Sequence, residues 1–184
     1  MADASRRAVF LDRDGTIVED PGFLHQPGKV RLLAGAGEAI HQLNQAGWLV
    51  ITVSNQSGIA RGLYDAAAYQ AVQRRLVELL AAHDARLDGA YFCPHHPEFT
   101  GPCECRKPGL LLFREAQAAL GLDLTRCRWV GDRLSDVEPA RKLGGRALLV
   151  ETGGGATYVG KARALRIPVV ADLAAAAAEI VRGA

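Results

Sequence analysis

A short apolar run that ends in two closely spaced carboxylates constrains this chain more than any other feature. Residues 8–11 are apolar, and Asp12, Asp14 and Gly15 follow within four positions. A run this short, ended by charged residues and glycine, favours a buried strand over a helix. Because glycine lets the chain turn, the two carboxylates can face one pocket from different directions. The sequence therefore predicts an acidic pocket at the end of a buried strand.

Two crowded carboxylates repel each other, and they are costly to bury unless a cation or hydrogen-bond donors answer their charge. Hard oxygen ligands suit Mg²⁺, which binds few protein oxygens and completes its octahedron with water and substrate phosphate. An acidic turn at the end of a strand is the alternative that this motif alone leaves open. The motifs further along the chain decide between the two.

The composition is that of one globular domain. The 184 residues are 49% hydrophobic and 23% charged, with a net charge of +2, which is enough chain for a sizeable core. No run of Lys or Arg points to nucleic acid or to an anionic membrane, and no apolar stretch has the length of a signal peptide or a membrane span. We expect a single domain over residues 1–184 in a soluble, cytoplasmic, monomeric protein.

Apolar runs and helical patterns alternate along the chain. Further strands are expected at residues 48–53, 90–92, 128–130 and 146–150, and helices at residues 36–46, 64–83, 109–120, 137–143 and 171–184. This alternation predicts an α/β fold with three layers, in which a Rossmann-like parallel sheet has helices on both faces. Ligands of such sheets bind at the carboxyl ends of the strands. No segment is long enough to form a separate cap domain.

Polar side chains follow the first two strands. Ser54, Asn55, Gln56 and Ser57 end the second strand, where hydroxyl and backbone N–H groups can hold phosphate oxygens without adding charge. The loop at residues 18–35 leaves the first strand and is a second candidate for substrate contacts. An ordinary polar turn and a surface connection are the plain alternatives for the two segments.

Three of the four cysteines crowd between residues 93 and 105. Cys93 and His95 form one pair, Cys103 and Cys105 form another, and a loop with Pro and Gly joins them. Two such pairs suit a tetrahedral S₃N zinc site, and a closed site with three thiolates is structural, because catalysis needs an open coordination position. His96 is the competing nitrogen ligand. Unrelated thiols are the alternative.

Two cations follow the last of these cysteines. Arg106 and Lys107 precede Pro108 and the helix expected from about residue 109. Proline is favourable at a helix start, and a helix N-terminus adds partial positive charge. We predict an anion site that the zinc loop holds in place, which explains why a metal would be put there. An exposed, solvated pair of cations is the alternative.

Four motifs in this order resemble the haloacid dehalogenase superfamily of phosphohydrolases. They are Asp-x-Asp-Gly-Thr at residues 12–16, Ser54, Lys107, and Gly-Asp at residues 131–132 with Asp136 four residues after the Asp. The resemblance implies that a phosphomonoester is hydrolysed through an aspartyl phosphate. It also implies that Ser54 and Lys107 bind the phosphoryl group, and that Asp136 positions Lys107 or a metal-bound water.

The same resemblance assigns the carboxylates. Asp12 would be the nucleophile and Asp14 the general acid and base, while Mg²⁺ would be held by Asp12, the carbonyl of Asp14, and Asp132. Intact carboxylates and Lys107 argue against a catalytically dead member of the fold. A non-catalytic, zinc-containing binding module therefore remains only as a less favoured reading.

The cysteine loop followed by Arg-Lys-Pro resembles the histidinol-phosphatase-like branch of this superfamily, which includes D-glycero-D-manno-heptose 1,7-bisphosphate 7-phosphatases and histidinol-phosphate phosphatases. Residues 20–27 and 54–62 resemble the heptose enzymes more closely, although Phe23 stands where those typically have Tyr. Arginines would suit the second phosphate of a sugar bisphosphate, whereas a substrate with an ammonium group would favour acidic residues at the rim. A histidinol-phosphate phosphatase is the alternative. The residues expected to contact the substrate are Arg13, Asp20, Phe23, Ser54, Asn55, Gln56, Ser57, Arg61, Arg106 and Lys107.

Overall fold

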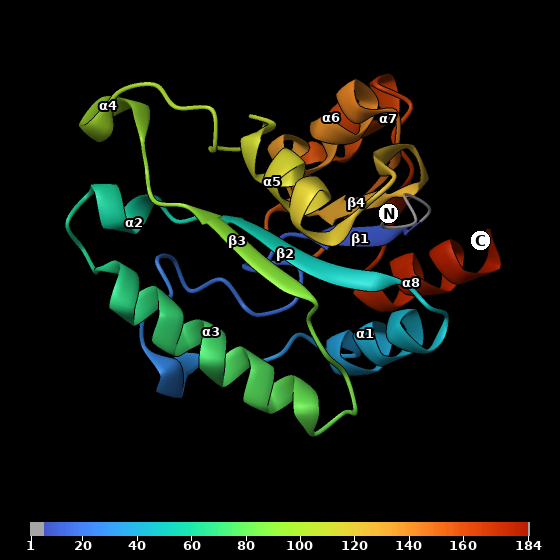
Figure 1. Cartoon of the computed structure of the whole chain (residues 1–184), viewed down its shortest axis with the longest axis horizontal. Helices are drawn as coiled ribbons and strands as arrows, with labels where there is room; N and C mark the ends of the chain where they lie inside the picture. The colour runs from blue at the N-terminus through green and yellow to red at the C-terminus, as the bar shows by residue number, and fades with distance from the viewer. Residues whose placement is uncertain (1–5, 184) are drawn as a thin grey trace.

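The computed structural model describes residues 6–183, and a parallel sheet of six strands forms its centre (Figure 1). The strands are β1 (Ala8–Leu11), β2 (Leu49–Asn55), β3 (Gly89–Cys93), β4 (Arg128–Gly131), β5 (Arg146–Val150) and β6 (Val169–Val170). Their order is β3-β2-β1-β4-β5-β6. The order reverses at β1, which lies between β2 and β4. The crevice at such a reversal is where α/β sheets bind ligands.

Helices cover both faces of the sheet. They are α1 (Ala36–Gln45), α2 (Ser57–Ala60), α3 (Ala66–Ala81), α4 (Pro97–Thr100), α5 (Leu111–Leu120), α6 (Leu134–Leu143), α7 (Val159–Ala164) and α8 (Leu173–Arg182), with 3₁₀ turns η1 (Pro27–Lys29), η2 (Leu124–Arg126) and η3 (Gly155–Tyr158). Figure 1 shows α1, α3 and α8 on one side of the sheet and α5, α6 and α7 on the other. In the part of the chain that the structure describes, no helix combines the length and the apolarity needed to cross a membrane.

Alternate residues of β1 enter two separate cores. Val9 and Leu11 pack with α1 and α8 residues in one apolar cluster, whereas Phe10 packs with Phe113 and Trp129 in the other. The Phe10 ring lies 5.1 Å from the Phe113 ring and 4.9 Å from the Trp129 ring, measured between centroids. Because successive side chains of a strand point to opposite faces, a strand buried on both faces is apolar at every position. The predicted three-layer α/β fold is confirmed.

Several element boundaries differ from the sequence predictions. The expected helix at 64–83 begins at Ala66, since the Asp65 side chain caps it by accepting from the Ala68 N–H at 2.8 Å. The expectation that Pro108 opens a helix is wrong. Gly109 turns the chain back onto the Glu104 and Arg106 carbonyls, and α5 begins only at Leu111. Pro108 therefore lies in the preceding turn, after a cis peptide bond.

Candidate active site

The carboxyl ends of β1, β2 and β4 converge on a cavity of about 450 Å³. Eight of the ten predicted substrate contacts line this cavity, namely Asp20, Phe23, Ser54, Asn55, Gln56, Ser57, Arg106 and Lys107, as do Asp12 and Asp14. Arg13 and Arg61 are not among the lining residues. Tyr64, Arg133 and Ser135 line it too, and sequence reasoning missed all three. A signal existed for Arg133 and Ser135, because both lie inside the fourth motif at residues 131–136, but there was none for Tyr64.

The Lys107 ammonium is the central cation of the cavity. Its Nζ lies 2.8 Å from Asp12 Oδ1 and 2.8 Å from Asp136 Oδ1, and it also donates to the Val53 carbonyl. Burial alone would lower the pKa of Lys107, but Asp12 and Asp136 raise it above its ordinary value, so the ammonium stays charged. Of the two roles left open for Asp136, the structure shows the contact with Lys107, whereas a contact with a metal-bound water stays a prediction.

The side-chain amide of Asn55 fixes the backbone of Lys107. It accepts a hydrogen bond from the Lys107 N–H at 2.9 Å and donates to the Lys107 carbonyl at 3.2 Å. Asn55 is the last residue of β2, so this pair of bonds ties the turn after the cysteine loop to the sheet. The oxygen and the nitrogen of the Asn55 side-chain amide are therefore both bonded to the Lys107 backbone. Its predicted substrate contact stays a prediction, while its contact with Lys107 is the role that the geometry defines.

Three carboxylates could hold a metal ion. Asp12, Asp132 and Asp136 each offer an oxygen, and these oxygens lie within 4.8 Å of one another. Asp132 is fully buried. Its Oδ2 accepts from the Gly154 N–H at 2.8 Å, but Oδ1 has no hydrogen-bond partner. Since an unpartnered buried carboxylate oxygen is costly, a cation beside it would be strongly favoured. The hard oxygen donors fit Mg²⁺.

Charge crowding in this cluster perturbs two acids. Burial, with Asp136 as the next cause, raises the pKa of Asp12 well above its ordinary value. Burial and then Asp136 also raise the pKa of Asp132 to about 6. Both shifts disfavour ionisation of groups that a bound divalent cation would hold ionised. The cluster is therefore strained electrostatically without a cation.

Two glycines allow the chain to close around Asp132. Gly15 and Gly153 have φ values of +88° and +56°, and a Cβ at these positions would lie 2.6 Å and 2.4 Å from Asp132 Oδ2. Only glycine accepts both the left-handed backbone and the close approach. The sequence contains no phosphate-loop motif at residues 153–155. The role of this segment, to surround Asp132 and donate one N–H to it, was therefore missed.

The Asp14 carboxylate is held from two sides. Arg13 Nε lies 3.2 Å from both carboxylate oxygens and Arg13 Nη2 lies 2.9 Å from Oδ2. Gln56 Nε2 donates to the same Oδ2 at 3.0 Å and contacts Ser54 Oγ at 2.6 Å, while Tyr64 OH donates to Gln56 Oε1 at 2.6 Å. Because Arg13 is fully buried, the structure places its guanidinium on Asp14 instead of on the cavity surface.

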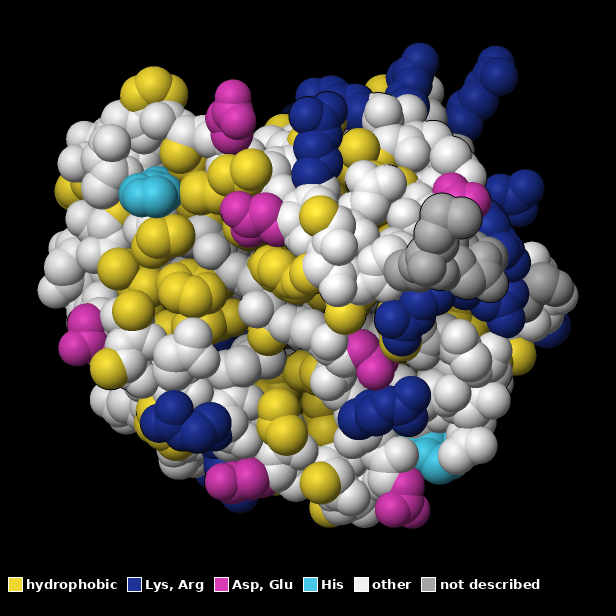
Figure 2. Space-filling view, in the orientation of Figure 1, with side chains coloured by type: hydrophobic (Ala, Val, Ile, Leu, Met, Phe, Trp, Pro, Cys, Tyr) yellow, Lys and Arg dark blue, Asp and Glu magenta, His cyan; other side chains and the backbone are white. Residues whose placement is uncertain are grey.

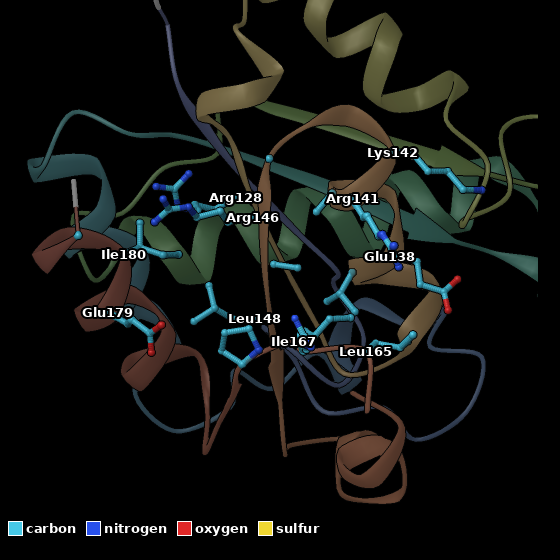
Figure 3. Close-up of a pocket in the computed structure, with 17 residues that line it drawn as sticks. Arg128, Glu138, Arg141, Lys142, Arg146, Leu148, Leu165, Ile167, Glu179 and Ile180 are labelled. Atoms are coloured by element: carbon cyan, nitrogen blue, oxygen red, sulfur yellow. The ribbon is translucent and has the colours of Figure 1, made fainter. Parts of the chain in front are cut away.

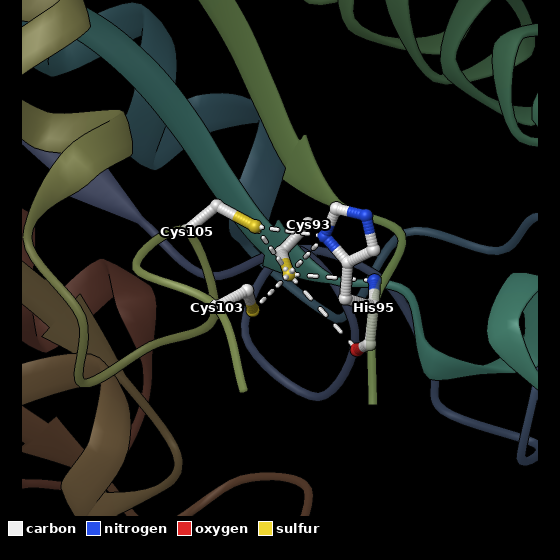
Figure 4. Close-up of side chains that lie close together, drawn as sticks. All are labelled: Cys93, His95, Cys103 and Cys105. Atoms are coloured by element: carbon white, nitrogen blue, oxygen red, sulfur yellow. Dashed lines mark hydrogen bonds between the residues drawn. The ribbon is translucent and has the colours of Figure 1, made fainter. Parts of the chain in front are cut away.

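The predicted zinc ligands form a cluster (Figure 4). The Cys93 Sγ lies 2.8 Å from Cys105 Sγ and 3.7 Å from Cys103 Sγ, and His95 Nδ1 lies 3.2 Å from Cys105 Sγ. All of these cysteines are free thiols. Four donors of this kind around one point fit a tetrahedral zinc site. His96, the competing nitrogen ligand, is not part of this cluster. Its Nδ1 instead accepts a hydrogen bond from the Glu98 N–H.

The two predicted arginines separate. Arg106 lines the cavity at the strand ends, and its Nη1 donates to the His95 carbonyl at 3.4 Å, which attaches it to the cysteine loop. Arg61 instead lies over the Phe99 ring at 4.7 Å and over the Phe23 ring at 5.9 Å, measured to the ring centroids. Arg133 takes the second cationic position at the rim, with Nη2 3.6 Å from Asp20 Oδ2. The rim of the cavity therefore carries two cations, Arg106 and Arg133, of which the sequence predicted only Arg106.

Comparison with known proteins identifies the family. A family model described as HAD-hydrolase-like, for haloacid dehalogenase, matches residues 104–176. A D-glycero-beta-D-manno-heptose-1,7-bisphosphate 7-phosphatase from Yersinia pestis is 39% identical over 165 residues, which covers 85% of this chain and 87% of the relative. The chain belongs to the haloacid dehalogenase superfamily. Its named relatives are phosphatases, and this protein is an enzyme of that class.

Other members of the superfamily agree with this assignment. An Escherichia coli K12 protein of the same name is 39% identical over 152 residues, which covers 79% of this chain and 80% of the relative. A crystal structure of D,D-heptose 1,7-bisphosphate phosphatase from B. bronchiseptica, complexed with magnesium and phosphate, has a TM-score of 0.88 and 34% identity, covering 97% of this chain and 99% of that one. A D,D-heptose 1,7-bisphosphate phosphatase from Burkholderia thailandensis has a TM-score of 0.71 and 31% identity, with 96% and 99% covered.

Asp132→Asn is expected to raise the melting temperature of the metal-free protein at pH 7.5 by a few degrees and to remove stabilisation by Mg²⁺. The folded-state pKa of Asp132, about 6, lies above the ordinary 3.8. Ionising this acid therefore costs stability above pH 6, and the cost disappears as the pH falls below about 4. Thermal denaturation at pH 7.5 and pH 5, with and without Mg²⁺, measures both effects. An equal response of the variant and wild type to Mg²⁺ would contradict the assignment.

Cys103→Ser is expected to lose bound zinc and to lower the melting temperature, because a hydroxyl replaces one of three thiolate ligands. Elemental analysis of the purified protein measures the metal. Cys127→Ser is the matched control. Cys127 lies outside the cluster, where its Sγ accepts from the Ala8 N–H at 3.3 Å, so this variant should keep its zinc. Equal zinc content in the two variants would refute the site.

Proposed function

We propose that this protein is a Mg²⁺-dependent phosphomonoester hydrolase that removes the 7-phosphate of D-glycero-β-D-manno-heptose 1,7-bisphosphate. One observation carries the chemistry: the buried Lys107 ammonium lies between Asp12 and Asp136 in a cavity that also contains Asp14. The names of relatives about 39% identical over most of both chains support the substrate and the anomer.

The proposed first step is in-line attack by a carboxylate oxygen of Asp12 on phosphorus. The bond between phosphorus and the sugar oxygen breaks as Asp14 gives its proton to that oxygen, which leaves an aspartyl phosphate. In the second step Asp14 takes a proton from water, the water oxygen attacks phosphorus, and the bond to Asp12 breaks. The contacts of Arg13 and Gln56 with Asp14 hold this acid in place between the two steps.

Charge on the transferring group is balanced by Lys107 and by the Ser54 hydroxyl, which faces the same cavity. The proposed metal ligands are Asp12, Asp132 and the Asp14 carbonyl. Bound Mg²⁺ would neutralise charge on phosphate oxygens, which is the largest contribution expected in phosphoryl transfer. The unpartnered Oδ1 of Asp132 supports this placement.

Two arginines at the rim support a substrate with a second phosphate. Arg106 and Arg133 line the cavity, as do Asp20 and Phe23. Guanidinium groups bind phosphate through paired hydrogen bonds. A substrate with an ammonium group would instead meet two like charges here, which disfavours histidinol phosphate.

The test of this proposal is phosphate release in Mg²⁺ buffer from the β anomer, the α anomer and histidinol phosphate at matched concentrations. We expect the highest kcat/KM for the β anomer. A preference for histidinol phosphate would overturn the substrate but keep the reaction, and a preference for the α anomer would overturn only the anomer. No release from any of the three would count against the proposed activity as a whole.

Asp12→Asn is expected to lower kcat by roughly a thousandfold or more, because an amide cannot form the aspartyl phosphate. The fold should be retained, since the amide is isosteric with the carboxyl group. Asp84→Asn, at an exposed turn far along the chain from the motif, serves as the control for a changed carboxylate. Substantial residual turnover in the Asp12 variant, beyond the level of deamidated protein, would remove Asp12 from the role of nucleophile.

Arg106→Ala is expected to raise KM for the heptose bisphosphate by roughly tenfold, the effect of losing one charged hydrogen bond, and to change KM for a small aryl phosphate by less than twofold. Arg61→Ala is the comparison variant, because the sequence predicted a substrate contact for Arg61 as well as for Arg106. Because Arg61 does not line the cavity, its removal should leave both KM values nearly unchanged. Equal effects of Arg106→Ala on the two substrates would show that Arg106 does not bind the distal phosphate.

A further inference from the structure

A second and larger cavity, of about 720 Å³, lies at the opposite end of the sheet from the carboxylates (Figure 3). Arg128 and Arg146 are the first residues of β4 and β5 and are paired in register, and both line this cavity. The catalytic Asp132 instead follows the carboxyl end of β4. Helix α6 connects the two regions, because Asp136 lies in its first turn and Arg141 in its last. Nothing in the proposed reaction uses this cavity.

The cavity exists because β6 is short. Its two residues pair only with Leu149 and Val150, so the first half of β5 has no neighbour on its outer edge. The Leu149 N–H donates across this edge to the Pro168 carbonyl. Residues two apart on a strand bond to the same side, so the N–H and C=O of Ala147 point to the open part of the edge. With α6 and α8 on opposite faces of β5, the cavity has the place of a missing strand.

The walls of the cavity are apolar and its rim is cationic. Leu148, Ile167 and Ile180 lie along the walls in Figure 3. Five cations line the cavity, namely Arg128, Arg141, Lys142, Arg146 and Arg166, against two acids, Glu138 and Glu179. Within residues 6–183, none of these five cations lies within 4.0 Å of a carboxylate oxygen. The excess of positive charge is therefore not compensated by the described part of the chain.

The Arg128 guanidinium shows the effect of this crowding. Burial lowers the pKa of Arg128, and the like charges of Arg146 and Arg7 lower it further. Its Nη1 donates only to main-chain oxygens, those of Arg126 and Cys127, at 3.2 Å and 3.1 Å. Like charges held together beside an apolar cavity attract an anion.

We propose that this cavity binds a small organic anion of the nucleoside monophosphate class, which carries a flat ring with apolar faces and a hydrogen-bonding edge. A flat ring would fill the place of the missing strand, with its faces toward the apolar walls and its edge toward the N–H and C=O of Ala147. Its anionic group would lie on Arg128 and Arg146. A volume of about 720 Å³ lies within the range of small-molecule sites.

The segment that leads into β6 limits the length of the occupant. Arg166 has a φ of +58°, and the next N–H, that of Ile167, donates back to the Ala162 carbonyl. This turn puts residues 165–168 along one boundary of the cavity. An extended peptide beside Ala147 would run into that turn. The shape therefore favours a compact molecule over an added strand from another protein.

Titration calorimetry with AMP, adenosine and inorganic phosphate, without added Mg²⁺, tests this proposal. We expect AMP to bind at least ten times more tightly than adenosine or phosphate. Arg146→Glu should weaken AMP binding at least tenfold, and Ile167→Asn should weaken both AMP and adenosine. Arg114→Glu, a change of the same charge on the exposed side of α5, should have no effect. Both exposed arginine variants should keep the phosphatase activity of the wild type.

Binding at the catalytic cavity is distinguished by Arg106→Ala, which should leave the affinity for AMP unchanged. The proposal is overturned if AMP does not bind, if adenosine or phosphate alone binds as tightly, or if Arg146→Glu behaves like Arg114→Glu. Loss of AMP binding in Arg106→Ala with retention in Arg146→Glu would place the nucleotide at the catalytic carboxylates, which also overturns it.

Discussion

The buried ion pairs of Lys107 are the interaction on which the arrangement of the site depends. Taking an ammonium group out of water is costly, and attraction to carboxylates offsets that cost only when the geometry is close. Asp12 and Asp136 provide it at 2.8 Å each, Asp12 from the end of β1 and Asp136 from the first turn of α6. Removing either acid would leave a buried cation underpaired. The pairs therefore couple the turn after the cysteine loop to β1 and to the start of α6. Lys107 and Asp12, the proposed phosphate-binding cation and the proposed nucleophile, therefore cannot be displaced independently.

The proposed metal site imposes the opposite demand on two of the carboxylates near Lys107. Burial and mutual repulsion raise the pKa values of Asp12 and Asp132, so their ionised forms weaken the metal-free fold at neutral pH. The surrounding structure does not reduce this cost in stability. Gly15 and Gly153 let backbone close over Asp132 where any side chain would collide, and one oxygen of Asp132 is left without a donor. Instability of this kind is the physical basis of affinity for a divalent cation.

The sequence predicted what local patterns determine, and it missed what depends on the approach of distant segments. The motifs at residues 12–16, 54 and 131–136 lie at the ends of buried strands, where apolar runs are easily recognised, and these strands form as expected. Strand β6 has two residues and no periodicity, so it gave no signal. The contact of Gly154 with Asp132 spans 22 residues, and the bonds from Asn55 to Lys107 span 52. Glycine and asparagine in loops are common enough that neither pattern indicates such a contact.

The sequence predicts no separate cap domain over the cavity. The cysteine cluster explains how the chain can nevertheless hold rigid cations there. Helix α4 in the loop has no buried residue, and Phe99 is 51% exposed, so this segment has no core of its own. Only the cysteine end packs against the sheet, through buried Cys93 and Cys105. Arg106 and Lys107 directly follow that end, and Arg106 donates back to the His95 carbonyl. A metal at this position would therefore hold a loop that has no core of its own, at the end from which both cations extend.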